Sequence, residues 1–328
     1  MAVPTPEAAA QEARRRAWIE EQEKNSKRLE WEALQELRKS RRQKNLAICV
    51  GSGVTLFSTM VKGKGVQDRL TWKGFIRNGF DYLQTKKPNY YEDNRKRLEK
   101  AVEDLYDNDS NVEDVLHVAN TLTQSMDKCG CFSDWLSSQF NKLHRHVKDN
   151  AILESLRKLH EADVTLMTTN YDGLIENYCR LQPLDGSQPQ QLVQFIRRNL
   201  PNVVFHPHGY WENPNHIVLD SRQYYEVGRE DNGVRETLKD VLKARTVVFV
   251  GCGAGLGDPN FGQLLQWLGK QQKDVNYGHY ILLKKGDDYR ELDSLPLNKV
   301  HVVTFEDIAP WLEGLLLDPD WSSDPTLE

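Results

Sequence analysis

The sequence has no long apolar run, few cysteines and little excess of charge of one sign. No apolar segment reaches the roughly 18 to 20 uninterrupted residues that cross a bilayer, so we predict no membrane-spanning helix. The five cysteines are an odd number, and two of them lie in strand-like apolar runs, which favours a reducing compartment over a disulfide framework. We therefore expect a cytoplasmic protein, with a nuclear location left open.

Two further absences narrow the partners. Lys and Arg number 43 against 48 Asp and Glu, and the net charge of -5 argues against nucleic acid as the default partner. Cys129 and Cys131 are separated by one residue and have no second pair, so their spacing predicts no zinc site. A length of 328 residues allows one large α/β core with additions, which we favour, or two domains.

Residues 7–43 contain neither Gly nor Pro and are rich in Ala, Glu, Arg, Lys and Leu, which predicts a helix. Thr5 is its expected cap, and Pro6 suits the first helical position. The apolar positions follow no strict heptad, so a long coiled coil is not indicated. A solvated helix is one interpretation. The other is an arm for homo-oligomerisation, because exposed side chains at Trp18 and Trp31 would need a surface to cover them.

Short β-branched apolar runs recur along the chain, as expected for parallel strands buried on both faces. The predicted fold is an α/β, Rossmann-like doubly wound parallel sheet of about six strands, with a helical subdomain inserted at about residues 72–160. Residues 1–44 form the N-terminal helical arm, 45–310 the core, and 311–328 a peripheral C-terminal tail. Polar residues 182–191, with two prolines, are predicted as a surface loop. The strand candidates are 46–50, 163–168, 203–205, 246–250, 280–283 and 301–305.

The first two strand candidates end in polar or glycine-rich residues, where open α/β sheets bind ligands. Gly51-Ser52-Gly53-Val54-Thr55 follows the first and predicts a phosphate loop, because glycines let backbone amides approach a pyrophosphate. Asn170 and Asp172 follow the second and predict a site. As helix caps, these two residues would need no ligand.

Two later strand candidates end in a similar way. His206 and His208 follow the third and are candidate acid–base groups, although a hydrogen-bonded structural histidine is the common alternative. A metal site ranks low, because no carboxylate or Cys stands at ligand spacing. Gly251 and Gly253 follow the run 246–250 and are consistent with a backbone close to a nucleotide. Asp258 before Pro259 can simply begin a helix.

Together these strand ends resemble the sirtuin-like superfamily, in particular its zinc-free NAD-hydrolysing branch, over roughly residues 45–305. Residues 51–55 are similar to its first nucleotide loop, Gly-Ala-Gly-x-Ser, and 168–173 to its Thr-Gln-Asn-x-Asp motif. His208-Gly209 is similar to the catalytic His-Gly, and 251–253 with 258–261 to the last loop and its Asp-Pro-x-Phe. Thr169 replaces the usual Gln, and the paired zinc cysteines and the Pro-Asp-Phe-Arg segment of the deacylases are absent.

The resemblance implies an NAD hydrolase that releases nicotinamide and ADP-ribose, with NAD as substrate and no metal. Asn170 would position the ribose hydroxyls or the attacking water, and His208 would act as base, with His206 in reserve. Asp172 would hold the nicotinamide carboxamide. The remaining residues expected to bind NAD are Gly51, Ser52, Gly53, Thr55, Thr169, Gly251, Gly253 and Asp258. A non-catalytic module that senses NAD or ADP-ribose is the alternative, and a protein deacylase ranks lowest.

Overall fold

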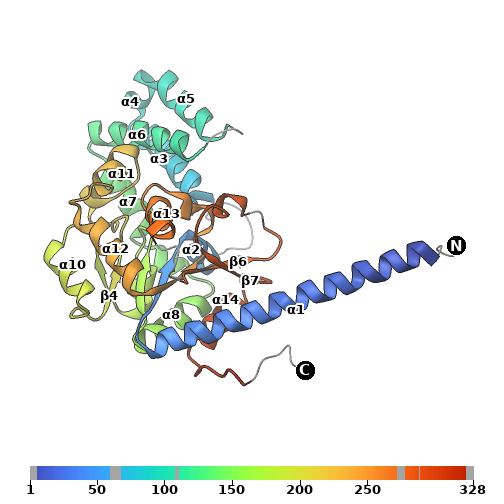
Figure 1. The fold of residues 1–328 in the computed structure, drawn as a ribbon. Coiled ribbons are helices and arrows are strands. Elements are labelled where there is room, and N and C mark those ends of the chain that lie inside the picture. Colours follow the sequence, from blue (N-terminus) through green and yellow to red (C-terminus); the bar gives the residue numbers. More distant parts are fainter. Residues whose placement is uncertain (1–5, 60–67, 108–110, 272–277, 288, 323–328) are drawn as a thin grey trace.

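In the described residues, 6–59, 68–107, 111–271, 278–287 and 289–322 of a computed structural model, seven strands form one parallel sheet (Figure 1). Their order is β3-β4-β2-β1-β5-β6-β7. The predicted doubly wound α/β fold is confirmed, with one strand more than the expected six. The strands are β1 (Leu46–Val50), β2 (Thr165–Thr168), β3 (Gln182–Leu184), β4 (Val203–Phe205), β5 (Thr246–Val250), β6 (Tyr280–Lys284) and β7 (Asn298–Val302).

Helices cover both faces of this sheet and extend beyond it. Those that precede β2 are α1 (Pro6–Arg42), α2 (Ser52–Ser58), α3 (Trp72–Lys86), α4 (Pro88–Asp93), α5 (Arg95–Leu105), α6 (Val112–Lys128), α7 (Phe132–Phe140) and α8 (Ala151–Glu161). Those that follow it are α9 (Leu174–Cys179), α10 (Pro189–Ile196), α11 (Ser221–Val227), α12 (Gly233–Ala244), α13 (Phe261–Gln271) and α14 (Ile308–Gly314).

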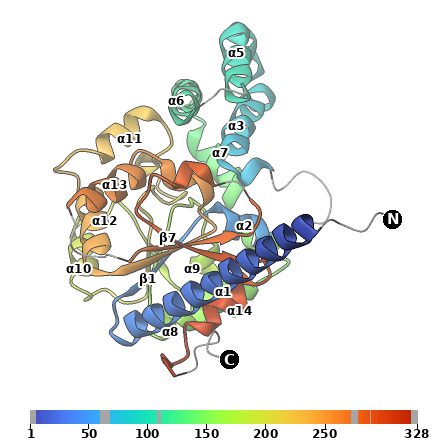
Figure 2. The ribbon, with the colours of Figure 1, turned by 45° about the vertical axis from the view of Figure 1, so that its right-hand side comes forward.

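The central strands are mostly apolar because each face of the sheet borders its own core. Ile48 and Val50 belong to the core beneath α8, α9 and α14, whereas Ala47 and Cys49 belong to the core beneath α10, α12 and α13. Successive side chains of a strand point to opposite faces, so a strand buried on both sides needs a continuous apolar run. Figure 2 shows α12 and α13 on one side of the strands and α1 and α14 on the other.

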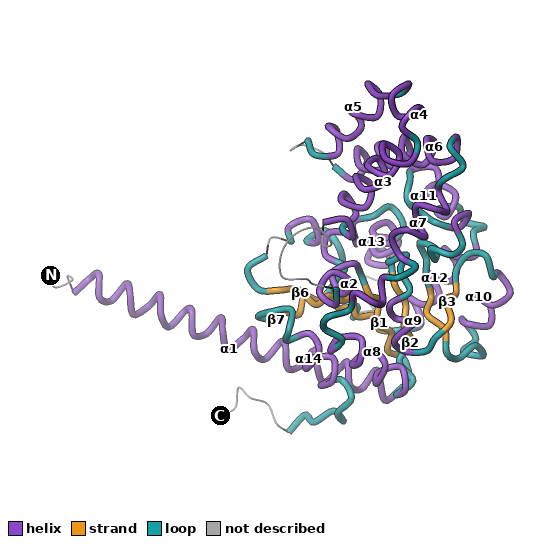
Figure 3. The backbone as a smooth tube through the Cα atoms, turned by 180° about the vertical axis from the view of Figure 1, so that it is seen from behind, coloured by secondary structure: helices purple, strands orange, loops and turns teal. Residues whose placement is uncertain are grey.

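The predicted helical insertion lies between β1 and β2. Helices α3 to α6 stack on one another above the strands and away from the projecting part of α1 (Figure 3). Trp135 of α7 is fully buried there and stacks on Phe75 of α3 at a ring-centroid distance of 4.3 Å. Helix α8, at the end of the predicted insertion, instead contacts β2, α9 and α14. The insertion therefore returns to the sheet one helix before β2.

Two predictions of secondary structure are wrong. Residues 182–191 are not a loop, since they contain β3 and the start of α10. Pro183 is tolerated in β3 because this strand lies at the edge of the sheet and pairs only with β4. The last strand begins at Asn298 rather than His301, and residues 303–305 lie beyond it. Its polar first residues are accepted because β7 forms the opposite edge.

Helix α1 is anchored at its C-terminal half, while its N-terminal half projects from the body (Figure 1). Leu37 is fully buried, and the ring of Trp31 meets that of Trp321 edge-to-face at 5.6 Å. Trp31 is therefore half-buried against another segment of the same chain. Trp18 remains 61% exposed. Pro6 begins the helix as predicted, and its expected cap Thr5 lies outside the described residues.

Part of the predicted C-terminal tail belongs to the hydrophobic core. Helix α14 crosses the boundary predicted at residue 310, and Leu312 and Leu315 are fully buried. Arg38 of α1 donates a hydrogen bond to the carbonyl oxygen of Gly314 at 2.8 Å. The segment thus fastens α1 to the body. Within the ranges given above, no helix is both long and apolar enough to span a membrane.

Candidate active site

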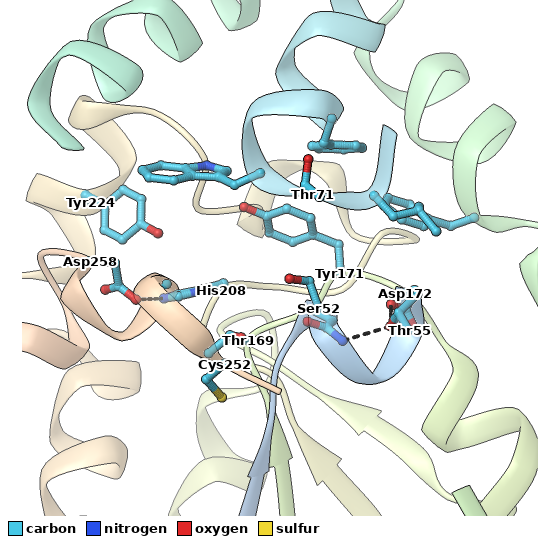
Figure 4. A pocket seen from close by; sticks show the side chains of 16 residues that line it. Ser52, Thr55, Thr71, Thr169, Tyr171, Asp172, His208, Tyr224, Cys252 and Asp258 are labelled. Carbon is cyan, nitrogen blue, oxygen red and sulfur yellow. Dashed lines mark hydrogen bonds and ion pairs between the residues drawn. The ribbon is translucent and has the colours of Figure 1, made fainter. Parts of the chain in front are cut away.

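A cavity lies at the carboxyl ends of the central strands. Strand β1 lies between β2 and β5, so the strands that follow it in the chain are added first on one side of it and then on the other. Such a switch point leaves a crevice at the carboxyl ends of a parallel sheet. The cavity holds about 110 Å³ and adjoins a groove of about 1070 Å³, with Ser52, Cys252 and Asp258 lining both. Its walls are Ser52, Thr55, Leu70, Thr71, Trp72, Phe75, Phe140, Thr169, Asn170, Tyr171, Asp172, His208, Tyr224, Cys252, Gly255 and Asp258 (Figure 4).

The glycine-rich loops after β1 and β5 pack backbone against backbone. The amide of Gly51 donates to the carbonyl of Val250, and that of Gly53 to the carbonyl of Gly251, each at 2.9 Å. A Cβ atom on Gly51 would lie 2.5 Å from the Cα of Cys252. Gly51 lines neither cavity nor groove, whereas Gly53, Gly251 and Gly253 line the groove. Gly51 therefore has a packing role that needs no ligand.

Replacing Gly51 by alanine is expected to destabilise the fold by about 2 kcal/mol or more, because the new methyl group meets rigid backbone. Denaturant unfolding of the purified proteins measures this difference. Gly255→Ala is the matched control, because a Cβ atom at Gly255 would meet nothing within 4 Å. Equal stability of the two variants would contradict the packing role.

Asn170, Thr55 and Asp172 form a hydrogen-bonded chain in the wall of the cavity, and Figure 4 shows Thr55 beside Asp172. The Asn170 amide donates to Thr55 Oγ1 at 3.0 Å, and the Thr55 hydroxyl donates to Asp172 Oδ2 at 2.7 Å. The other carboxylate oxygen of Asp172 accepts from the backbone amide of Leu174 at 3.0 Å. Asp172 thus binds the first backbone amide of α9, whose N-cap position is Gly173, and is a buried anchor for Asn170 through Thr55.

Burial raises the pKa of Asp172, while the hydrogen bonds from Thr55 and from the Leu174 amide oppose that rise. Thr169 is fixed beside this chain, because its backbone amide donates to the carbonyl of Val50 at 3.0 Å. The end of β2 is therefore tied to the end of β1, which sets the position of the Asn170 side chain.

The two histidines after β4 occupy different environments. His206 is fully buried outside the cavity, with Nε2 at 2.5 Å from Glu176 Oε1 and Nδ1 at 3.0 Å from the carbonyl oxygen of Asn170. His208 lines the cavity. Residues two apart in a strand would point to the same face, but β4 ends at Phe205, and the turn at Pro207 redirects the chain between the two histidines. The next residue, Gly209, has a φ of +87°. A Cβ atom on Gly209 would lie 2.2 Å from the carbonyl oxygen of His216.

His206 is a structural group that supports the backbone of Asn170. Burial alone would lower its pKa, but the Glu176 carboxylate and the bond to Asn170 outweigh burial and raise it. A raised pKa in the folded state contributes stability that is complete below the unfolded value of about 6.5 and is lost as pH rises through the folded value.

The stability margin of the parent over Glu176→Gln is accordingly expected to be largest below about pH 6.5 and to narrow at higher pH. Unfolding free energies of both proteins, measured in denaturant from about pH 6 to about pH 9, give this margin. A margin that stayed constant or widened with pH would show that His206 is not held in its charged form.

His208 faces Asp258 on the side of the cavity opposite Thr55 and Asp172 (Figure 4). Its Nε2 atom lies 3.6 Å from Asp258 Oδ2, and both residues are 4% exposed. Burial raises the pKa of Asp258, against the opposing effect of His208. Asp258 Oδ1 accepts from the amides of Asn260 and Phe261 at the start of α13, which confirms the helix-start interpretation of this residue.

Sequence reasoning missed the aromatic walls of the cavity. Trp72 and Phe75 come from α3, Tyr171 from the segment after β2, and Tyr224 from α11. The spacing of these residues in the sequence does not indicate that their rings meet. In the structure, the ring centroids of Phe75 and Tyr171 lie 5.6 Å apart. The cap of α3, where Thr71 accepts from the amide of Gly74, marks that helix start but not its position over the sheet.

The cysteine pair of the insertion lies at the junction of α6 and α7, apart from the cavity. All five cysteines are free. Across the part of the chain that the structure describes, no group of three or more His, Cys, Asp and Glu side chains is placed to hold a metal ion.

The fold is a Rossmann-like α/β domain, and a cavity lies at the switch point of its sheet. Residues 164–303 match the sequence model of the SIR2-like domain. Over 128 residues the chain is 27% identical to "Defense-associated sirtuin 2" of Bacillus subtilis, and this match covers 38% of the chain and 12% of that protein. Residues 164–303 of the chain are therefore similar to the SIR2-like domain, in agreement with the resemblance of the strand-end motifs that lie within this range.

Proposed function

We propose that the protein is an NAD hydrolase that cleaves the bond between nicotinamide and ribose. The observation that carries the proposal is that Asn170 and His208, from different strand ends, line one cavity beside a glycine-rich groove. A SIR2-like domain implies the use of NAD. The groove, with Gly53, Gly251 and Gly253 in its wall, is large enough for the ADP-ribose part of the molecule.

In the proposed reaction, the ribose C1′–nitrogen bond breaks and its electron pair leaves with nicotinamide, which becomes neutral. The sugar passes through an oxocarbenium-like state, as in other glycosidic cleavages. A water oxygen then bonds to C1′ and its proton passes to His208, which later releases it to solvent. Asn170, fixed by Thr55, orients the water or the ribose hydroxyls. The aromatic walls limit access of other water to the cavity.

The name of the Bacillus relative favours a role for this activity in defence, which we include in the proposal. A module that binds NAD or ADP-ribose without cleaving it is the second candidate. It is favoured by the two protein hydrogen bonds that already engage Asp172, which leave this side chain less free for nicotinamide than predicted. Protein deacylation remains the lowest-ranked activity.

Incubation of the purified protein with NAD, with nicotinamide and ADP-ribose quantified by chromatography, tests the proposal. Release without any acyl-lysine peptide supports the hydrolase and argues against the deacylase. Tight binding of NAD without release of nicotinamide, in every assembly state that the protein adopts, would support the sensing module instead.

We further propose that α1 is an arm through which copies of the chain associate. Trp18 and Leu29 are 61% and 59% exposed and lie about three turns apart, which places them on one face of the helix. Large apolar side chains that a projecting helix exposes are suited to contact with a partner. The expected homo-oligomer would bring several sites together.

Trp18→Ser combined with Leu29→Ser is expected to shift the protein to a smaller assembly in sedimentation velocity. Tyr106→Ser, at another exposed apolar residue far from α1, is the control and should leave the mass unchanged. A double variant that sediments like the parent would contradict the proposal that copies of the chain associate through α1.

A further inference from the structure

The facing atoms of His208 and Asp258 are both buried and both incompletely satisfied. His208 Nε2 and Asp258 Oδ2 lie 3.6 Å apart, and neither has a hydrogen-bond partner among the described residues. Buried polar atoms without partners are uncommon in folded proteins and often occur where function requires them. Here the two orphaned atoms point at each other, at the wall of the proposed active site (Figure 4).

We propose that Asp258 is the positioning residue of His208, rather than a group that binds NAD. This inference rests on the proposed hydrolase. Asp258 holds the ring with its Nε2–H directed at the carboxylate, so that Nδ1 presents its lone pair to the cavity. A neutral imidazole carries one donor and one acceptor, and the partner of the first nitrogen decides which role the second takes.

The carboxylate is itself fixed in place. Asp258 Oδ1 accepts from the amide of Asn260 at 2.7 Å and from that of Phe261 at 3.0 Å, so the carboxylate cannot rotate without losing the cap of α13. Its second oxygen is therefore held toward His208. The 3.6 Å gap is an ion-pair distance, and such contacts in active sites commonly shorten when substrate binds.

The ring is held from its other sides by aromatic groups. The His208 ring meets Tyr224 at a centroid distance of 5.5 Å and Phe261 at 5.7 Å, both edge-to-face. These contacts restrict rotation of the imidazole, so that exchange of Nε2 and Nδ1 by a ring flip is hindered. When Nδ1 accepts a proton in the reaction, the Asp258 carboxylate stabilises the resulting imidazolium.

A positioning role and a binding role differ in kinetics. If Asp258 holds His208, its loss lowers kcat and leaves KM nearly unchanged, because the interaction acts on the base in the reaction step. If Asp258 binds NAD, its loss raises KM. The variant Asp258→Asn keeps an oxygen to cap α13 but replaces the second oxygen with an N–H₂ donor. Its amide would favour the opposite tautomer, with the proton on Nδ1.

The experiment compares the parent, Asp258→Asn and the exposed control Asp231→Asn. We expect Asp258→Asn to lower kcat by roughly a hundredfold or more while KM stays within about twofold of the parent value. Asp231→Asn should change neither kcat nor KM. Nitrogen-15 NMR of histidine-labelled protein should show neutral His208 protonated at Nε2 in the parent and at Nδ1 in Asp258→Asn. An unchanged tautomer, or a rise in KM without a fall in kcat, would overturn the proposal.

Asp258→Ser separates the loss of the contact with His208 from a folding defect, because serine can cap α13 but cannot reach His208. It should fold and show a kcat loss like that of Asp258→Asn; full activity in this variant would also overturn the proposal. The tautomer measurement needs no turnover. A parent that released no nicotinamide would refute the hydrolase, while the NMR result would still decide whether Asp258 orients His208.

Discussion

His208→Ala is expected to lower the kcat for nicotinamide release by roughly 10²- to 10⁴-fold, the range over which a positioned general base contributes. His208 is the histidine that lines the cavity, whereas His206 is used in the buried pair with Glu176. Removing the imidazole leaves the attacking water without a proton acceptor. The rate is measured by chromatography of nicotinamide under saturating NAD.

His216→Ala is the matched control for this variant. His216 is an exposed histidine on the segment that follows Gly209, and it lies outside the cavity. Thermal unfolding of both variants checks that the fold is retained, because removing His208 leaves the buried Asp258 without its facing group. If His208→Ala retained the parent rate while folded, His208 would not be the base.

Asn170→Ala is expected to lower kcat by roughly 10²-fold or more, because the amide that orients the ribose hydroxyls or the water is lost. Thr55→Val keeps the size of the side chain but removes the hydroxyl that links Asn170 to Asp172, and it should lower kcat by a smaller factor, about tenfold. Thr55→Ser keeps the hydroxyl and is the matched control.

The double variant tests whether Thr55 acts through Asn170. If Thr55 only positions this amide, Asn170→Ala with Thr55→Val should be little slower than Asn170→Ala alone, so that the two effects are not additive. Full additivity of the two losses would show that Thr55 contributes by itself, for example by contacting NAD directly.

Much of the sheet could be predicted because a strand buried on both faces appears in the sequence as a continuous apolar run. The predicted bounds of β1 and β5 match the observed ones, because all of their residues except Thr246 are buried apolar side chains. The edge strands were harder: β3 has three residues and contains Pro183, and β7 opens with Asn298. Edge strands pair on one side only, so their sequences carry a weaker pattern.

The sequence predicts that Asn170 and His208, each at a strand end, share one site, and the structure places both in the wall of one cavity. Choosing between His206 and His208 required coordinates, because the sequence gives both the same strand end. Gly51 was expected to contact NAD, but its close approach is to the backbone of Cys252. Asp258 read as a helix start, and only the tertiary fold places its second oxygen opposite His208.

The most direct test of the account is the fate of NAD with the parent protein and with His208→Ala. The account predicts that the parent converts NAD to equal amounts of nicotinamide and ADP-ribose, and that the folded His208→Ala variant releases almost none. Intact NAD after incubation with the parent in each of its assembly states, or equal release by the two proteins, would contradict it.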